Sequence, residues 1–363
     1  MKIAIFADTH IHPYSRYSSI GESGQNSWVE ETLDTMRRMY EKCCELNVHE
    51  VWFAGDLFHT GEKIQTEVFN AVVRFFDDVP LPTTLIAGNH DFANRHNKEC
   101  ILTALEPYVR VVIDRICETY YKAPDRAVAM VPYGISKEEI ECCPSMKSIL
   151  TGKPGPGNTT GKIPPLIVVG HLAMEGAVTG ANEFQPPGGL SASIFAKTEQ
   201  TFLGHYHKRQ QLTPKVQYVG SLVSTSFNET GEQKGFTVLT LEEGKDLQIE
   251  FVSLKSTGFQ VIDLDEKSKE SDEVLDGNIV RVDYTGVIDE SEVRMIMLSQ
   301  GARRVIFNCK TPRETIMRVV TEGDREPELN DYLKTWVDTH GEGFDKERLL
   351  AVGKRLAKDV RNV

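Results

Sequence analysis

Short apolar runs that end in glycine or a polar residue recur through the first 240 residues of the chain. Each run has the length and composition of a buried β-strand. The runs are KIAIFAD, HEVWFAGD, LPTTLIAGNHD, RAVAMVPYG, PPLIVVGHLAM, TFLGHYH and VQYVGSL. Between the first two, the segment from Trp28 to Leu46 has apolar residues at the spacing of one helix face: Val29, Leu33, Met36, Met39, Tyr40 and Cys43. This alternation predicts an α/β core with buried central strands.

The composition is typical of a globular protein and not of a membrane or disulfide-linked one. Apolar residues make up 40% of the 363 residues and charged residues 26%. No apolar run approaches the roughly 20 residues that span a bilayer, and MKIAIFADTH turns polar too early for a signal peptide. The seven cysteines include no C-x-x-C pair, which favours reduced thiols. We expect a cytoplasmic protein with no membrane partner.

Five fragments place a potential metal ligand directly after one of the predicted strands. They are Asp8-x-His10, Gly55-Asp56, Gly88-Asn89-His90-Asp91, Gly170-His171 and Gly204-His205-x-His207. Strand ends of an α/β sheet meet at one edge, so these side chains are expected to converge. Carboxylate, amide and imidazole ligands without cysteine favour Mn²⁺, Fe or Zn²⁺ over Ca²⁺. The set is large enough for a two-metal phosphoryl-transfer site, in which Asp56 can bridge the ions.

The fragments D-x-H, G-D, G-N-H-D, G-H and G-H-x-H resemble the signature of the calcineurin-like metallophosphoesterase superfamily over about residues 1–240. Two finer features are similar to the SbcD / meiotic-recombination-eleven family of DNA repair nucleases. GDLFHTG has His59 and no arginine, and YVGSLVSTSFNETGEQKGF (218–236) resembles that family's G-S, S-F-x-E and K-G segment. The resemblance implies a four-layer αββα sandwich of a bacterial or phage protein.

The same resemblance implies roles for the site residues. The ligands of the first ion would be Asp8, His10 and His207, those of the second Asn89, His171 and His205, with Asp56 bridging. Both ions would be divalent, with Mn²⁺ favoured and Mg²⁺, Fe or Zn²⁺ as alternatives. His90 would stabilise the transition state and protonate the leaving oxygen, with His59 assisting or positioning it. Asp91 is expected to orient a histidine or a turn.

Four further residues are candidates for substrate contacts. Strand parity places His12 on the same side as Asp8 and His10. Pro13 then turns the chain into a long polar loop, so His12 either faces the substrate phosphate at the rim or anchors that loop. Arg16, between Tyr14 and Tyr17, and the pair Lys208 and Arg209 either contact nucleic acid or are solvated surface residues.

The chain is expected to divide at about residues 255 and 320. Residues 1–255 would form the metallophosphoesterase nuclease domain and 256–320 a small α+β capping domain. Residues 321–363 would form a helical tail with two apolar stripes. The stripes are Leu329, Tyr332, Leu333, Trp336 and Val337, and Leu349, Gly353, Leu356 and Val360. These helices either pack on their own domain or dock to a partner; in the family, the tail binds the coiled coil of an ABC-type ATPase.

The function implied by the resemblance is metal-dependent DNA cleavage. It would combine 3′–5′ exonuclease and single-strand endonuclease activity in a homodimer that works with an SbcC-type ABC ATPase in break processing, recombination or DNA degradation. The net charge of −12 opposes tight DNA binding by this chain alone, so the partner would supply most of the positive field. The alternatives are a small-molecule or cyclic-nucleotide phosphodiesterase on the same fold, and a non-enzymatic binding protein.

Overall fold

The computed structural model describes residues 1–310, 333–338 and 345–360, apart from residues 15, 22–23, 95, 97–98, 124, 156–160, 181, 266–274, 276 and 335. Side chains are not described for residues 355–360. The chain forms two compact units. The first contains residues 1–283 and 288–308, and the second contains residues 284–287 and 309–363.

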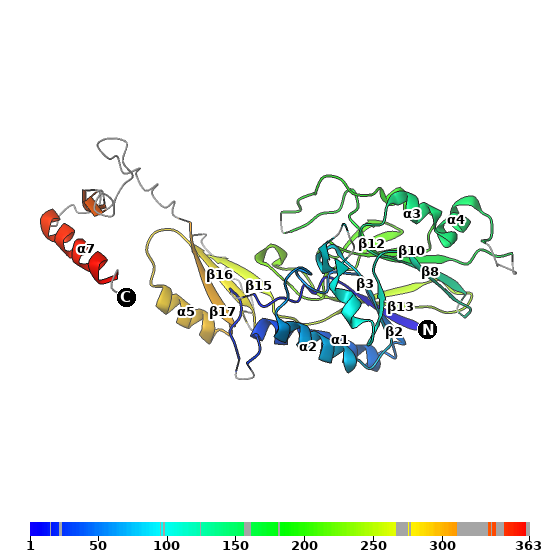
Figure 1. Cartoon of the computed structure of the whole chain (residues 1–363), viewed down its shortest axis with the longest axis horizontal. Coiled ribbons are helices and arrows are strands. Elements are labelled where there is room, and N and C mark those ends of the chain that lie inside the picture. Colours follow the sequence, from blue (N-terminus) through cyan, green and yellow to red (C-terminus); the bar gives the residue numbers. More distant parts are fainter. Residues whose placement is uncertain are drawn as a thin grey trace. The chain divides into compact units, whose positions relative to one another are not determined.

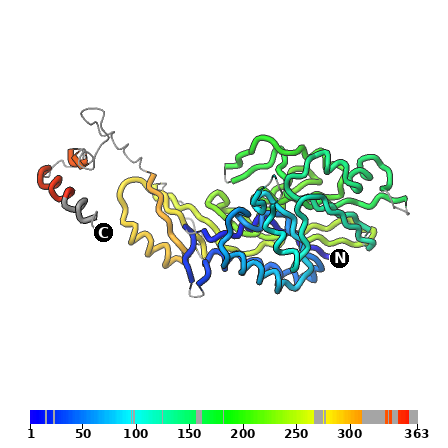
Figure 2. Tube along the Cα trace, viewed as in Figure 1, coloured from blue at the N-terminus to red at the C-terminus, as the bar shows by residue number. Residues whose placement is uncertain are grey.

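Two six-stranded mixed sheets make up most of the first unit (Figure 1). The first has the order β14 (Gln248–Ser253), β13 (Gly235–Thr240), β1 (Lys2–Phe6), β2 (Glu50–Phe53), β3 (Thr83–Ile86) and β6 (Arg110–Val112). The second has the order β11 (Gln210–Thr213), β12 (Val216–Tyr218), β10 (Gln200–Gly204), β9 (Leu166–His171), β8 (Arg126–Val131) and β7 (Cys117–Tyr121). The seven predicted strand runs are confirmed, and they form the parallel centres of the two sheets together with β13 antiparallel to β1, which Figure 2 shows side by side.

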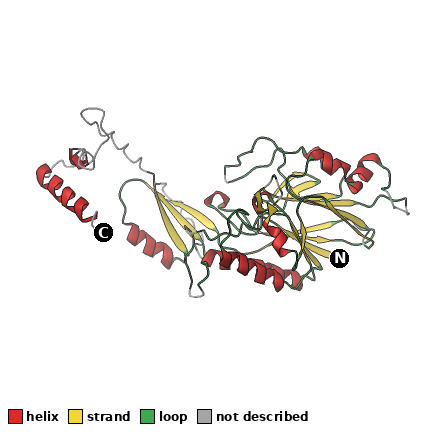
Figure 3. Cartoon of the chain, viewed as in Figure 1, coloured by secondary structure: helices red, strands yellow, loops and turns green. Residues whose placement is uncertain are grey.

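The sheets stack face to face with helices on both outer faces, as Figure 3 shows. Alternate residues of the central strands, such as Ile5, Trp52 and Phe202, are fully buried between the sheets. The opposite residues pack under α1 (Ser27–Glu45) and α2 (Thr66–Asp77) on the first sheet and under α3 (Lys137–Cys142) and α4 (Pro144–Thr151) on the second. Because each central strand is covered on both faces, it can be apolar throughout. The predicted four-layer αββα sandwich is confirmed.

Helix α1 shows how the sequence sets these layers. Its N-cap residue Asn26 accepts hydrogen bonds from the backbone N–H groups of Trp28 and Val29, which satisfies donors that the first helical turn leaves free. All six apolar residues of the predicted stripe are buried against the first sheet. The prediction of a helix from Trp28 to Leu46 is therefore confirmed to within one residue at each end.

A three-stranded sheet with one helix follows the sandwich in the first unit. Its order is β15 (Phe259–Asp263), β16 (Ile279–Tyr284) and β17 (Arg304–Cys309), and α5 (Glu290–Ser299) packs on it through Val293 and Met297. Phe259 contacts Tyr17 and Phe227 of the sandwich at ring-centroid distances of 5.0 and 4.8 Å. The remaining short strands are β4 (Phe92–Asn94) and β5 (Glu99–Cys100). The exact boundaries of the predicted capping domain stay a prediction.

The second unit contains α7 (Lys346–Val360) and a short helical segment at residues 333–338. The missing side chain of Gly353 brings α7 close to Leu333, whose Cδ2 lies 3.1 Å from the position of a Cβ. Val337 is buried, whereas Trp336 is 55% exposed. Leu329 and Tyr332 of the predicted stripe, and the side chains of Leu356 and Val360, lie outside the described residues. Within the described part of the chain, no helix is long and apolar enough to cross a bilayer.

Candidate metal centre

The predicted ligands come from both sheets and meet where the two sheets approach each other most closely. A Cβ on Gly204 of β10 would lie 2.2 Å from the carbonyl oxygen of Ala54 after β2, so only glycine fits there. Backbone hydrogen bonds then link the strand-end loops. The N–H of Asp8 donates to the Gly55 carbonyl at 3.0 Å, and the N–H of His10 donates to the Asp56 carbonyl at 3.1 Å.

Four of the predicted ligands have left-handed backbone conformations. The φ angles are 54° for Asp8, 42° for His10, 62° for Asp56 and 102° for His205. Side chains other than glycine rarely adopt such angles, and they persist where the surrounding structure requires them, often at functional sites. The expectation that strand parity aims Asp8, His10 and His12 is wrong in its reason, because β1 ends at Phe6 and the chain beyond it is not extended.

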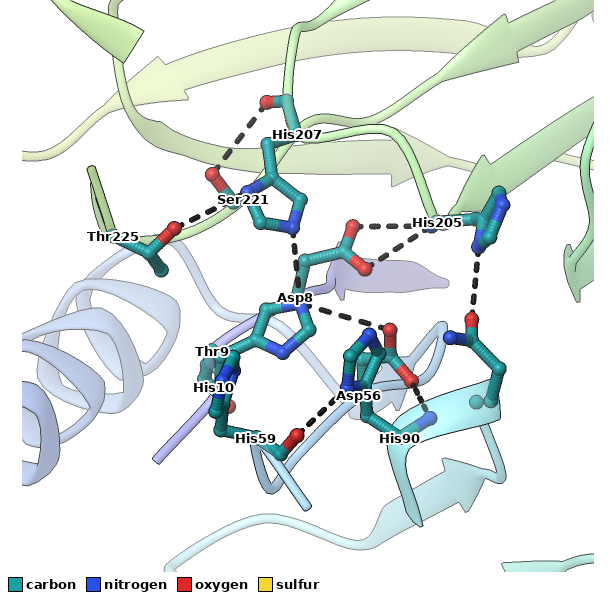
Figure 4. A network of polar contacts seen from close by, with 12 residues as sticks. Asp8, Thr9, His10, Asp56, His59, His90, His205, His207, Ser221 and Thr225 are labelled. Atoms are coloured by element: carbon teal, nitrogen blue, oxygen red, sulfur yellow. Dashed lines mark hydrogen bonds and ion pairs between the residues drawn. The ribbon is translucent and has the colours of Figure 1, made fainter. Parts of the chain in front are cut away.

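The first ligand cluster consists of Asp8, His10 and His207 (Figure 4). The Nε2 atoms of His10 and His207 lie 2.9 Å apart. The Asp8 carboxylate accepts hydrogen bonds from the backbone N–H of His205 at 3.1 and 3.2 Å, which fixes its position. Asp56 Oδ2 lies 3.6 Å from His10 Nε2, at the border of this cluster.

The second cluster consists of Asp56, His171 and His205, with Asn89 beside them. Asp56 Oδ2 lies 3.3 Å from His171 Nε2. Asn89 Oδ1 lies 3.0 Å from His171 Nε2 and 2.9 Å from His205 Nδ1. The structure thus brings all seven predicted ligands together, with Asp56 in reach of both clusters.

The donor atoms fit a pair of divalent cations. Two imidazole nitrogens that share one ion at about 2.1 Å, with bonds at right angles, lie about 3 Å apart, which matches the separation of His10 and His207. Two metal-facing nitrogens keep a lone pair because the opposite ring nitrogen faces an acceptor. His171 Nδ1 lies 2.8 Å from the Ala54 carbonyl, and His207 Nδ1 lies 2.9 Å from a carboxylate oxygen of Glu229.

The electrostatics of the site favour positive charge at its centre. Burial raises the pKa of Asp8 to about 6, while burial and the neighbouring His207 lower the pKa of His10. Burial and His171 lower the pKa of His205 to about 3. Although burial opposes a charge on His171, the Asp56 carboxylate raises its pKa to about 9. In the metal-free protein, a proton on His171 therefore supplies charge that a bound cation would replace.

His90 and His59 lie beside the first cluster with stacked rings, 5.5 Å between centroids and 19° between planes. The Nδ1 of His90 is 2.7 Å from the His59 carbonyl oxygen, and its backbone N–H donates to Asp56 Oδ1 at 2.8 Å. His90 is therefore fixed relative to the shared carboxylate. Burial and the neighbouring His12 lower the pKa of His59 to about 4, so its ring is neutral at pH 7.

Three residues that support the site have no such role in the sequence-based prediction, or only a general one. Glu229, identified only as part of a family segment, holds His207 and in turn contacts Lys234 Nζ at 2.7 Å. Ala54 orients His171 through its carbonyl oxygen, which no side-chain pattern can reveal. Asp91, expected to orient a turn or a histidine, accepts backbone hydrogen bonds from Asp56, Phe58 and Gly88 at 2.9–3.0 Å.

The four candidates for substrate contacts are arranged less uniformly. The ring of His12 lies 5.1 Å from that of His59 and lines a cavity of about 250 Å³ that also includes Thr60 and Lys63. Arg16 is exposed. Lys208 forms an ion pair with Glu183 at 2.7 Å, and the Arg209 guanidinium lies 4.6 Å from the centre of the Phe251 ring. Both cations therefore already have protein partners.

The sequence also matches known proteins. The pattern of the family Metallophos, described as calcineurin-like phosphoesterase, matches residues 1–209, which is more than half of the chain. The curated SbcD component of the nuclease SbcCD from Staphylococcus epidermidis is 25% identical over 218 residues. That match covers 56% of this chain and 58% of the relative, so the chain spans little more than half of that protein's length.

Solved structures with a similar fold include an animal and a plant phosphatase. A dimetal phosphatase from Danio rerio is 12% identical, with a TM-score of 0.40, and the match covers 71% of this chain and 99% of that one. A purple acid phosphatase from yellow lupin is 14% identical, with a TM-score of 0.44 and coverage of 70% and 51%.

Proposed function

Since the chain belongs to the calcineurin-like phosphoesterase family, we propose that it is a metal-dependent DNA nuclease of the SbcD type. The observation that carries the chemistry is the convergence of seven ligands on two clusters, with Asp56 between them and His90 held at its side. The similarity to the SbcD component of a nuclease supports DNA as the substrate. The absence of arginine and the presence of His59 in GDLFHTG favour the same substrate class.

The roles of the residues follow from their contacts. Asp8, His10 and His207 would hold one divalent ion, Asn89, His171 and His205 the other, and Asp56 would bridge them. We favour Mn²⁺, which suits mixed oxygen and imidazole ligands. Two such ions clamp the attacking and leaving oxygens of a phosphodiester and neutralise the developing charge.

His90 would act on the leaving group. Its Nδ1 faces the His59 carbonyl, so Nδ1 carries a proton and Nε2 is the nitrogen available to a substrate oxygen. A histidine in this position can donate a proton to the 3′ oxygen that leaves. His59, stacked on His90 and neutral at pH 7, would position that ring, and the polar rim with His12, Arg16, Lys208 and Arg209 would contact the DNA backbone.

The proposed partners are DNA, a second copy of the chain and an SbcC-type ABC ATPase. The ATPase is suggested by the name of the similar protein, which is one component of the nuclease SbcCD. It would also compensate for the net charge of −12, since counterion-driven DNA binding needs local positive charge. Light scattering checks the dimer, because a chain of 40.8 kDa would then give about 82 kDa, twice the single-chain mass.

One assay tests the activity. The protein is incubated with linear duplex DNA, single-stranded circles, bis-p-nitrophenyl phosphate and cyclic nucleotides, with Mn²⁺ or Mg²⁺. We expect loss of nucleotides from 3′ ends and cleavage of the circles, both abolished in Asp56→Ala and retained in Asp77→Ala, which changes an exposed carboxylate at the end of α2. Hydrolysis of only the small esters or cyclic nucleotides would identify a small-molecule phosphodiesterase instead.

A further inference from the structure

The two ligand clusters have different second partners for their histidines. In the second cluster, the ring of His171 is oriented by a neutral backbone carbonyl, that of Ala54. In the first cluster, the ring of His207 is oriented by the carboxylate of Glu229, which is only 5% exposed. A carboxylate makes an imidazole a more basic ligand than a carbonyl does, and it fixes the tautomer more strongly.

Glu229 is itself held by several donors. Its Oε1 accepts hydrogen bonds from the Thr225 hydroxyl at 2.6 Å and the Thr225 backbone N–H at 3.3 Å. Its Oε2 lies 2.7 Å from Nζ of Lys234, which is 5% exposed and also contacts Glu232 at 2.8 Å. Surrounded by these donors, the carboxylate stays ionised and in one rotamer. The ring of His207 is therefore set before any ion arrives.

The charges on the ligands differ in the same direction. The first cluster contains the carboxylate of Asp8, whereas the matching ligand in the second cluster is the neutral amide of Asn89. Asp56 contributes equally to both if it bridges. A divalent cation in the first cluster thus meets one additional negative charge directly and a second one, on Glu229, through His207.

From these contacts we infer that the two ion positions are unequal, with the Asp8, His10 and His207 position binding its ion more tightly, and that Glu229 is the positioning residue for His207 that makes it so. This inference rests on the ligand roles in the proposed function. Its consequence is regulatory. At limiting metal the protein holds one ion, and phosphoesterase activity follows the filling of the Asn89, His171 and His205 position.

Titration of the metal-free protein with Mn²⁺ tests the inference without any substrate. Isothermal calorimetry should resolve two binding steps whose dissociation constants differ at least about tenfold, and electron paramagnetic resonance should show isolated ions before coupled pairs. Glu229→Gln should weaken the tighter step about 10- to 100-fold, the usual effect of losing a second partner of a metal ligand. Glu232→Gln is the matched control, because Glu232 contacts the same Lys234 but not His207.

Several results would overturn the inference. They are two equal steps in the wild-type protein, an unchanged tight step in Glu229→Gln, or an equal loss in Glu232→Gln. If Glu229→Gln does not fold, Thr225→Val removes only one hydroxyl contact to the carboxylate and should weaken the same step by a smaller factor. Failure to bind Mn²⁺ at all would instead refute the proposed function, whereas two unequal steps without DNA cleavage would refute only the substrate.

Discussion

Replacing Gly88 with alanine tests how closely the loops of the metal centre must approach. The φ of Gly88 is −94°, so alanine suits its backbone and only space is at issue. A Cβ there would lie 2.2 Å from Asp56 Oδ1 and 2.3 Å from the Asp56 backbone nitrogen. Ordinary carbon contacts begin near 3.5 Å, so the Asp56 carboxylate must move by about 1 Å.

The displaced carboxylate should impair both metal binding and turnover. A shift of about 1 Å costs about 100-fold in rate, or about 2.7 kcal/mol of barrier. The overpacking itself should reduce the free energy of unfolding by about 1–3 kcal/mol, which lowers Tm by several degrees. The assays are Mn²⁺-dependent hydrolysis of bis-p-nitrophenyl phosphate, metal content by mass spectrometry and Tm by circular dichroism.

Gly155→Ala is the control for this experiment. Gly155 also lies outside the left-handed region, and the nearest atom to its Cβ would be Ser148 Oγ at 3.1 Å, a side chain away from the ligand clusters. It should behave like the wild type in all three assays. If Gly88→Ala kept two ions and lost less than threefold in kcat/KM, the position of Asp56 would not depend on the missing side chain, and the reasoning would be refuted.

His90→Ala should lower kcat by about 10²- to 10⁴-fold while metal content stays at the wild-type value; loss of both ions in this variant, or an equal loss of rate in the exposed control His96→Ala, would contradict the role of His90. Metal affinity should rise with pH up to about 9, because His171 must lose its proton to bind metal and Asp56 raises its pKa to about 9; calorimetry in buffers of different ionisation enthalpy should detect close to one proton released at pH 7, and no release would count against it. Arg126→Met should reduce the free energy of unfolding by about 3–5 kcal/mol, because it leaves Glu199 without a buried partner that lies 2.7 Å away; urea denaturation measures this, and a midpoint equal to the wild type would refute it.

Local sequence patterns were sufficient for much of the fold. The strands around Ile5, Trp52 and Val168 are apolar throughout because each is covered on both faces, and such runs stand out in a sequence. The stripe from Val29 to Cys43 records the buried face of α1. The same logic found the seven ligands, because a polar side chain directly after a buried strand marks the edge where sites form.

Other features depend on the meeting of distant segments. Glu229 lies 22 residues from His207 in the chain, and nothing in the spacing of the two indicates that a carboxylate should contact Nδ1. Sequence patterns contain no signal for the Ala54 carbonyl that orients His171, since every residue has such a group. Strand parity likewise failed at Asp8 and His10, where tertiary contacts hold the backbone in the left-handed region.

The ligand types, their order along the chain and the layered α/β core follow from short-range periodicity and side-chain chemistry, so the order of residues is enough to predict them. The atoms that face each other become known only once the chain is folded. Folding places Asp56 between the two clusters, and it puts a carboxylate behind His207 but a carbonyl behind His171. The physical reason is that such contacts join two sheets. Their geometry is set by how closely the sheets pack at glycines such as Gly204, and no local pattern records that distance.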